Sequence, residues 1–398
     1  MAKTVRYILM QEYKPTVIES QVFSWLETTR DLFEYNAVVS VVSSQGGQLS
    51  KKRVDEIESE HGIRYYQIAL PGVIGIRDII LLFFVLKLYF KHLGAGSLIL
   101  QSRFMLFSFI SPIISLLPKL KLVYEARGTA TVEYKYGVDA GRVSARKERI
   151  VRLRERLILK YSDLIISVSQ KQKDFFAKEY GAKSANKAIV IPGAADALKF
   201  YYREELRTAV RERMGLEEKT VFLYSGRLDK PWQIPEEVFR TFKHIHVHVP
   251  NAFFIILTPD KDIAKQLFTK NGVPDSSFFI TYTTLAEIND YLNATDYGIL
   301  FRENLPINNQ ASPTKFAEYI LSGLRVIISE GVGDFSGFVR EHDCGQVVSL
   351  VDGAFEVDTP KLSPYASEER ERISKLGHNL LSTQVFKTKL RKSFAALR

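Results

Sequence analysis

A short block in the last third of the chain combines a hydroxyl, a lysine and a glutamate at the start of a predicted helix. Ser312 is a favourable helix N-cap and Pro313 suits the first helical position, so a helix is expected to begin here. Lys315 and Glu318 stand three positions apart and would share one face of that helix. A helix N-terminus beside a cation and a carboxylate is suited to a phosphate and a ribose. A surface helix with an i,i+3 ion pair is the alternative, and these residues alone leave both open.

A second candidate is the loop after a predicted strand at residues 221–225. Gly226 permits a tight turn at the strand end, and Arg227 and Lys230 would place two cations at the carboxyl edge of a sheet, where a diphosphate could bind. A strand followed by glycine and a basic residue is a weak sign of phosphate binding by itself. This loop and the helix after Ser312 are, however, both expected to belong to the domain built on the second sheet. Both would therefore face one crevice.

Two arginines in the first half of the chain also follow predicted strands. Arg103 comes after the strand at 98–101, and Arg127 comes after the strand at 120–125. Each would lie at the carboxyl edge of the first sheet, within reach of an anionic acceptor or the leaving phosphate. An ordinary ion-pair role is the alternative for both.

Other patterns predict no further site. The glycines of 331–337 follow a strand, but their GxGxxxG spacing indicates a turn rather than a dinucleotide loop. His244, His246 and His248 alternate, which scatters them around a helix, so we expect no metal. We expect no bound cofactor. The lone Cys344 excludes an intramolecular disulfide and favours a reducing compartment.

The elements that must position these residues alternate along both halves of the chain. Short apolar strands followed by helices are the signature of doubly wound parallel sheets. The pattern breaks at residues 192–196 and resumes at 221. We therefore predict an α/β fold with two Rossmann-like domains, 1–195 and 196–398, facing a central cleft. The helical tail is expected to pack back on the first domain. The predicted strands are 5–10, 37–42, 65–68, 98–101, 120–125, 164–168, 188–191, 221–225, 253–257, 278–281, 297–301, 325–329 and 346–349. The main predicted helices are 19–32, 52–61, 78–93, 105–116, 146–161, 170–180, 235–248, 261–270, 285–293, 314–321 and 334–342.

The charge balance indicates an anionic partner. The 398 residues carry 55 Lys and Arg against 45 Asp and Glu, a formal net charge of +10. Nucleotide phosphates and an anionic bilayer both fit. No zinc-ligand spacing, helix-turn-helix or RNA-binding aromatic motif is present, so we expect no nucleic-acid partner.

One very apolar segment, 76–93, bears on the membrane question. Its uncharged run, 79–86, is too short to span a bilayer. We favour a buried helix of an α/β domain. The alternative is a helix lying in the bilayer interface, with Lys87 and Lys91 reaching the headgroups.

Four parts of the sequence resemble motifs of one enzyme family: 124–128; 162–169 with 189–193; 224–228; and, most specifically, 312–328. Over nearly its whole length the chain resembles the retaining, nucleotide-sugar-dependent glycosyltransferases of the GT-B fold, glycosyltransferase family 4 (the glycogen-synthase-like group).

The resemblance implies roles for the candidate residues. Arg227 and Lys230 would be catalytic, holding the donor diphosphate and stabilising its charge as the glycosidic bond breaks. Glu318 would accept hydrogen bonds from the ribose, and the first domain, with Arg103 and Arg127, would bind the acceptor. The expected donor-binding residues are Gly226, Gln310, Ser312, Thr314, Lys315 and Glu318. Transfer would retain the anomeric configuration without a metal, and the leaving diphosphate would help to deprotonate the acceptor.

The chain also departs from the family pattern. Gln310 stands where the family has a second glutamate, eight residues before the ribose-binding one. Lys230 follows Arg227 by three positions rather than about five, and Arg325 replaces a proline. The glycine-rich loop expected after the first strand is absent.

We therefore expect a hexosyltransferase that moves a sugar from a nucleoside diphosphate sugar to a hydroxyl acceptor. A glycan or lipid-linked intermediate of surface polysaccharide biosynthesis would fit as acceptor. The expected location is the cytoplasm, with peripheral attachment to the inner face of the cell membrane as a secondary expectation. A non-catalytic GT-B-like binding subunit of a polysaccharide assembly complex and a sugar-nucleotide epimerase of the same fold stay open as alternatives.

Overall fold

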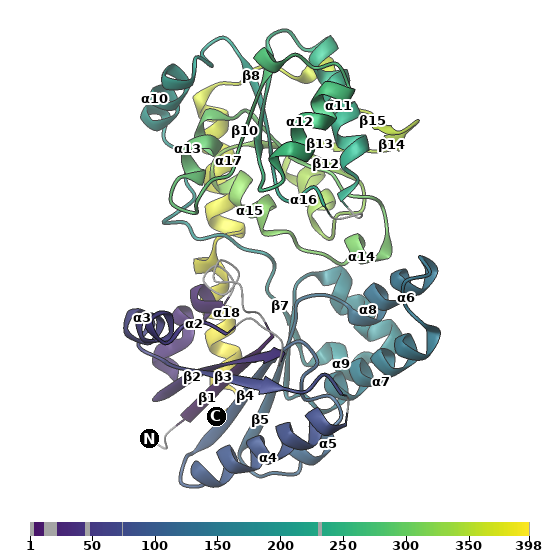
Figure 1. Ribbon diagram of the computed structural model, residues 1–398. Helices are drawn as coiled ribbons and strands as arrows, with labels where there is room; N and C mark the ends of the chain where they lie inside the picture. The colour runs from purple at the N-terminus through teal and green to yellow at the C-terminus, as the bar shows by residue number, and fades with distance from the viewer. Residues whose placement is uncertain (1–3, 12–21, 44–47, 74, 230–232, 398) are drawn as a thin grey trace. The chain divides into compact units, whose positions relative to one another are not determined.

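The computed structural model describes residues 4–11, 22–43, 48–73, 75–229 and 233–397. The chain divides into two compact units: unit 1 is Met1–Ile191 with Phe386–Arg398, and unit 2 is Pro192–Val385. Each unit contains one parallel sheet with helices on its faces (Figure 1). Among the described residues, no helix is both long enough and apolar enough to cross a membrane.

The sheet of unit 1 has seven parallel strands in the order β3-β2-β1-β4-β5-β6-β7. Its central strands are apolar on both faces, as expected for a sheet covered by helices on both sides. The strands are β1 (Thr4–Met10), β2 (Tyr35–Ser43), β3 (Arg64–Leu70), β4 (Ser97–Arg103), β5 (Leu120–Ala126), β6 (Leu164–Ser167) and β7 (Ala188–Val190). The helices are α2 (Ser24–Thr29), α3 (Lys51–His61), α4 (Ile76–Lys91), α5 (Ser111–Ile114), α6 (Ala130–Asp139), α7 (Ala145–Tyr161), α8 (Gln170–Tyr180) and α9 (Ala182–Asn186).

Serine caps begin three of these helices. The hydroxyls of Ser50, Ser144 and Ser169 accept hydrogen bonds from backbone N–H groups in the first turns of α3, α7 and α8. α3 ends at Gly62, whose φ of 57° is a left-handed conformation that glycine adopts without strain. These local signals explain why the sequence pattern located these helices well.

Helix α18 (Thr383–Ala395) anchors the end of the chain on unit 1. The Phe394 ring meets the Phe33 ring edge-on, with centroids 5.6 Å apart, and Arg391 Nη2 donates to Asp31 Oδ2 at 2.7 Å. The buried Arg6 guanidinium lies 4.2 Å from the Phe33 ring centroid and 5.6 Å from that of Phe394. Residues 386–398 therefore belong with the first sheet although they follow the second in sequence.

The sheet of unit 2 has six parallel strands in the order β10-β9-β8-β11-β12-β13. The strand order reverses between β8 and β11, and such reversal points form ligand-binding crevices at the carboxyl ends of the strands. The strands are β8 (Thr220–Ser225), β9 (Ala252–Leu257), β10 (Phe278–Thr281), β11 (Tyr297–Leu300), β12 (Arg325–Ser329) and β13 (Gly345–Val348), with a small hairpin of β14 (Leu350–Val351) and β15 (Ala354–Phe355). The helices are α10 (Glu204–Met214), α11 (Pro235–His248), α12 (Lys261–Lys270), α13 (Ile288–Ala294), α14 (Pro306–Asn309), α15 (Thr314–Leu321), α16 (Phe335–His342) and α17 (Ser367–Leu380).

Two helical expectations for unit 1 need correction, and two of its helices, α6 and α9, were not expected. The expected helix at 105–116 is a series of turns followed by the short α5, because Pro112 lacks the N–H that a continuous helix would need. Within the described part of the expected helix 19–32, α2 gives way to a 3-10 turn at Arg30–Leu32. The sequence analysis did not predict α6, whose β-branched and aromatic residues and Gly137 are weak helix formers.

Candidate functional site

The candidate site lies at the carboxyl edge of the second sheet, where β8 and β11 are neighbours. Tyr319 of α15 joins these strands: its hydroxyl accepts a hydrogen bond from Ser225 N at 3.1 Å. Its ring packs on Gly298 of β11 so closely that a Cβ there would lie 2.4 Å from a ring carbon. Glycine at 298 therefore lets α15 approach the sheet, which brings the α15 side chains to the ends of β8 and β11.

The start of α15 differs from the expectation in one respect. The helix begins at Thr314, and no side chain caps its first turn. The Ser312 hydroxyl instead accepts a hydrogen bond from Gly193 N at 2.8 Å, and a Cβ on Gly193 would lie 2.4 Å from the Ser312 carbonyl oxygen. Ser312 therefore ties residue 193, near the start of unit 2, to the site and is not the N-cap that we expected.

Lys315 and Glu318 share one face of α15. Lys315 Nζ donates to Glu318 Oε2 at 2.8 Å, and the carboxylate is largely buried while the lysine is partly exposed. This pair places one cation and one acceptor of hydroxyl hydrogen bonds next to Tyr319.

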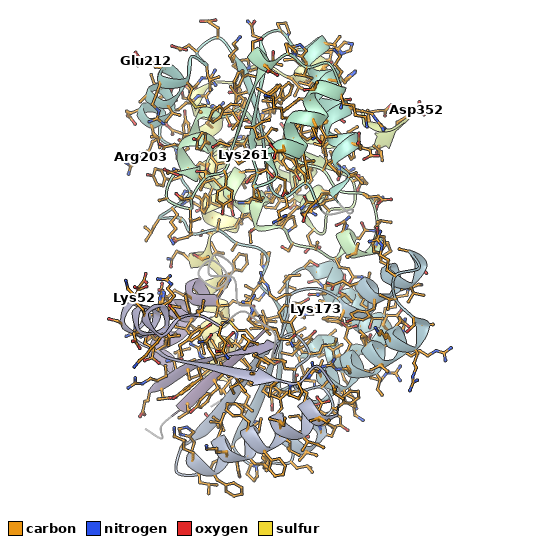
Figure 2. All side chains as sticks on the ribbon, in the orientation of Figure 1. Lys52, Lys173, Arg203, Glu212, Lys261 and Asp352 are labelled. Atoms are coloured by element: carbon orange, nitrogen blue, oxygen red, sulfur yellow. The ribbon has the colours of Figure 1, made fainter. Side chains whose placement is uncertain are left out.

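Arg227, after β8, is held by two carboxylates. Its Nε and Nη2 donate to the two oxygens of Asp229, both at 2.9 Å, and Nη2 also donates to Asp260 Oδ1 at 3.0 Å. Hydrogen bonds with Asp229 raise the pKa of this exposed guanidinium above its ordinary value. Asp260 follows β9 and directly precedes Lys261, which is the first residue of α12. Lys261 is labelled in Figure 2. The predicted partner Lys230 lies outside the described residues.

Arg302, after β11, is a cation that the sequence analysis missed. Its backbone is fixed by Ser329, whose hydroxyl accepts from Arg302 N and donates to Arg302 O, both at 2.8 Å. Burial lowers the pKa of its guanidinium, which lies near Tyr224 and Tyr319. Arg302 stands two residues beyond the end of its strand, so the rule that singled out Arg103 and Arg127, a basic residue after a predicted strand, would also have found it.

The remaining expected donor residues border the same edge. Gly226 N donates to Leu257 O at 3.0 Å, which keeps the loop after β8 against the end of β9. Gln310 is buried directly after α14, and Thr314 opens α15. Next to Gln310, the buried Asn309 Oδ1 has no hydrogen-bond partner among the described residues.

The two arginines expected to bind an acceptor meet in unit 1. Arg103 Nη1 and Arg127 Nη1 lie 3.3 and 3.7 Å from the same Glu125 oxygen, and Gln101 Nε2 donates to the other Glu125 oxygen at 3.0 Å. The cavity that these side chains line measures about 20 Å³, room for roughly one water molecule. The two arginines therefore belong to an ion-pair cluster in this structure, and their role in acceptor binding stays a prediction.

No metal site is apparent in the described part of the chain, where no group of three or more His, Cys, Asp or Glu side chains is placed to hold an ion. The ring centroids of His244 and His248 lie 4.3 Å apart with the rings tilted by 38°, so these two side chains lie side by side although we expected the three histidines to be scattered. The pKa of His244 is lowered by burial and then by His248.

Comparisons with known proteins bear on the fold. No protein-family model matches the sequence, and no curated protein matches it. Among solved structures, Anabaena Alr3699/HepE in complex with UDP superposes with a TM-score of 0.71 at 12% identity, covering 99% of this chain and 100% of that one. Sucrose-phosphate synthase from Thermosynechococcus elongatus gives 0.66 at 13% identity, covering 99% of each chain. WaaG, a glycosyltransferase involved in lipopolysaccharide biosynthesis, gives 0.56 at 15% identity, covering 98% of this chain and 93% of that one.

The chain has the GT-B fold. The expected α/β class with two Rossmann-like parallel sheets is confirmed, since the likeness spans almost the full length of the compared chains. At these identities the likeness establishes architecture alone.

Proposed function

We propose that the chain is a glycosyltransferase that moves a hexose-type sugar from a nucleoside diphosphate sugar to a hydroxyl acceptor with retention of configuration. The observation that carries the proposal is the carboxyl edge of the second sheet. There α15 brings the Lys315–Glu318 pair to the ends of β8 and β11, at the reversal of strand order. HepE structures with UDP and with UDP-glucose support a uridine nucleotide as donor. The 312–328 motif supports family 4 and retention.

In this mechanism the bond between the anomeric carbon and the diphosphate oxygen breaks, and the acceptor oxygen bonds to the same face of the sugar. The acceptor proton passes to the departing diphosphate, so no separate protein base and no metal are needed. Cations at the sheet edge, with Arg227, Lys230 and Lys315 as candidates, stabilise the charge that develops on the diphosphate. Glu318 accepts hydrogen bonds from the ribose, which fixes the donor.

The test is a thermal-shift panel with UDP, GDP, ADP and CMP compounds. A ligand at 100 times its Kd should stabilise the protein by about 2.7 kcal/mol. Glu318→Gln should remove most of the shift while leaving the unliganded melting temperature nearly unchanged, because the amide keeps the size of the side chain. Glu287→Gln, an exposed residue of unit 2, is the matched control and should keep the full shift. No shift with any nucleotide would refute the proposal.

Turnover separates this function from its alternatives. A glycosyltransferase releases a nucleoside diphosphate in an acceptor-dependent manner. An epimerase of the same fold would convert the sugar nucleotide without acceptor. A binding subunit would bind the nucleotide without any turnover, and this alternative stays open because Gln310 stands where the family has a second glutamate. The proposed acceptor is a glycan or lipid-linked intermediate of surface polysaccharide.

The surface of α4 supports a lipid-linked acceptor at the inner face of the cell membrane. One face of the helix is buried through Leu81, Val85 and Leu88, as we favoured, but the other is exposed. On the exposed face Phe83 and Phe90 are 68% and 64% accessible. The other exposed apolar side chains on or beside α4 and α5 are Val73, Ile76, Ile79, Ile80, Leu93, Ile113 and Leu116.

The excess of basic residues around this apolar face favours an anionic bilayer as the surface that it binds. Asp78, which is buried, is the sole acidic residue between residues 71 and 119. The basic residues of that segment are Arg77, Lys87, Lys91, Arg103 and Lys119. An apolar helix face flanked by lysines inserts at the headgroup boundary and gains from anionic lipid.

Vesicle co-sedimentation tests this attachment. The protein should bind phosphatidylglycerol-containing vesicles at low salt more strongly than neutral ones, and Phe83→Ser with Phe90→Ser should abolish binding. Leu198→Ser, at an 81% exposed leucine of unit 2, is the matched control. Unchanged binding in the double variant, or dimers of the wild type that the double variant abolishes, would refute membrane docking by this face.

A further inference from the structure

Arg302 differs from the other arginines that we considered at a sheet edge, because it has no acidic partner in the part of the chain that the structure describes. Arg103 and Arg127 share Glu125, and Arg227 binds Asp229 and Asp260. No carboxylate of the described residues forms an ion pair with the Arg302 guanidinium, and the titratable side chains that influence its pKa are the phenols of Tyr224 and Tyr319. Arg302 is only partly exposed, and an unpaired charge with reduced access to water is unfavourable, so this arrangement needs an explanation.

The two phenols do not neutralise it. The Tyr224 hydroxyl lies 3.0 Å from both Arg227 O and Gln233 Oε1, and the Tyr319 hydroxyl accepts from Ser225 N. Burial raises the pKa of both phenols well above the ordinary tyrosine value, so both stay neutral at physiological pH. The positive charge of Arg302 is therefore uncompensated among its neighbours.

The position of Arg302 in the fold indicates which kind of group would neutralise its positive charge. It follows β11, the strand paired with β8 where the strand order reverses, and ligands of doubly wound sheets bind at that edge. Tyr319, which neighbours Arg302, is adjacent in sequence to Glu318 on α15. The Ser329 hydroxyl holds both backbone polar groups of Arg302, so the residue sits on a fixed loop rather than a loose one.

We propose that Arg302 binds the diphosphate of the donor and is the principal cation of the site, ahead of Arg227. This inference rests on the proposed function and specifies which residue receives the ligand charge. A guanidinium offers two parallel N–H donors to phosphate oxygens. The Arg302 fork has no carboxylate to release first, whereas Arg227 must leave Asp229 or Asp260 before it can bind an anion with its full charge.

Calorimetric titration of the full chain tests the proposal with three probes: uridine, UDP and inorganic pyrophosphate. Arg302→Gln should weaken UDP and pyrophosphate binding about 10- to 100-fold, the range for losing a hydrogen bond to a charged group. Uridine, which has no phosphate, should bind this variant as it binds wild type. Arg213→Gln, at a largely exposed arginine of α10, is the matched control and should leave UDP affinity unchanged. Arg227→Gln should weaken UDP binding less than Arg302→Gln does, because two carboxylates already hold that side chain.

Arg302→Lys is the conservative variant and should recover part of the UDP affinity, since it restores charge without the fork. It also keeps the test decisive if Arg302→Gln fails to fold.

Each other outcome has a definite meaning. A larger loss in Arg227→Gln than in Arg302→Gln overturns the proposal, as does equal loss of uridine and UDP binding in Arg302→Gln, which would assign Arg302 to the fold. If wild type binds pyrophosphate through Arg302 but no nucleoside diphosphate, the anion site stands and the proposed function fails. If wild type binds neither, both fail.

Discussion

The two ends of β11 differ in whether the arginine side chains near them have an acidic partner. At the amino end, the fully buried Asp296 accepts from Arg207 Nη2 at 2.8 Å, from Arg370 and from Val221 N at 2.7 Å, with Arg211 at 3.5 Å. At the carboxyl end, Arg302 has no carboxylate of the described residues as partner. One four-residue strand thus separates a buried carboxylate that binds several arginines from an arginine that has no carboxylate partner among the described residues.

We infer from this difference that the amino end of β11 serves stability, and we propose that its carboxyl end serves binding. Arg207 belongs to α10, Arg370 to α17 and Val221 to β8, so the Asp296 carboxylate joins two helices and a strand. Both oxygens of this carboxylate are already bound by groups of the protein. The carboxyl end instead has a cation on a fixed loop, which is how a sheet edge that receives an anion would be built.

The largest expected effect is at the amino end. Asp296→Ala leaves buried arginines without their anion, and breaking a buried ion pair from one side costs about 3–5 kcal/mol. Urea denaturation followed by circular dichroism should show this as a large fall in the unfolding midpoint. Asp290→Ala is the control: its 3.4 Å pair with Arg213 is largely exposed and should contribute at most about 1 kcal/mol. Equal losses in the two variants would remove the distinction between the clusters.

Local patterns predicted most of the fold but not these clusters. Every predicted strand overlaps one of β1–β13, because a strand covered on both faces leaves a continuous apolar run between turn residues. Asp296 follows a helix and precedes a strand, so in sequence it resembles a turn residue. Its partners Arg207 and Arg370 come from distant segments that only the fold brings together.

The site shows the same limit residue by residue. The spacing of Lys315 and Glu318 was sufficient to place them on one face, since that depends on helix geometry alone. The hydrogen bond between Arg227 and Asp260 was not predictable, because Asp260 lies at the end of a different strand. Likewise Ser312 was expected to cap α15, but the backbone N–H of Gly193 binds its hydroxyl.

A smaller effect is expected from Tyr319, which holds α15 on the strand ends. Tyr319→Phe removes the acceptor of the Ser225 N–H, a partly buried donor, and should lower the unfolding free energy by about 1 kcal/mol. The ring stays on Gly298, so the strands and α15 should keep their packing. Tyr282→Phe, at a 58% exposed tyrosine, should leave the midpoint unchanged. A loss from Tyr319→Phe as large as that from Asp296→Ala would mean that the carboxyl end is also built for stability.

The smallest effect, and the sharpest test of the comparison, concerns Arg302 without ligand. A cation that lacks an anion contributes little to stability, since its contacts with the phenols are offset by the cost of removing the charge from water. Arg302→Gln should therefore shift the unliganded unfolding free energy by no more than about 0.5 kcal/mol. Saturating UDP should then stabilise wild type by mass action and the variant much less, so the two denaturation curves separate only when nucleotide is present. If Arg302→Gln unfolds as readily as Asp296→Ala in the absence of ligand, the guanidinium is structural, and both ends of β11 serve stability.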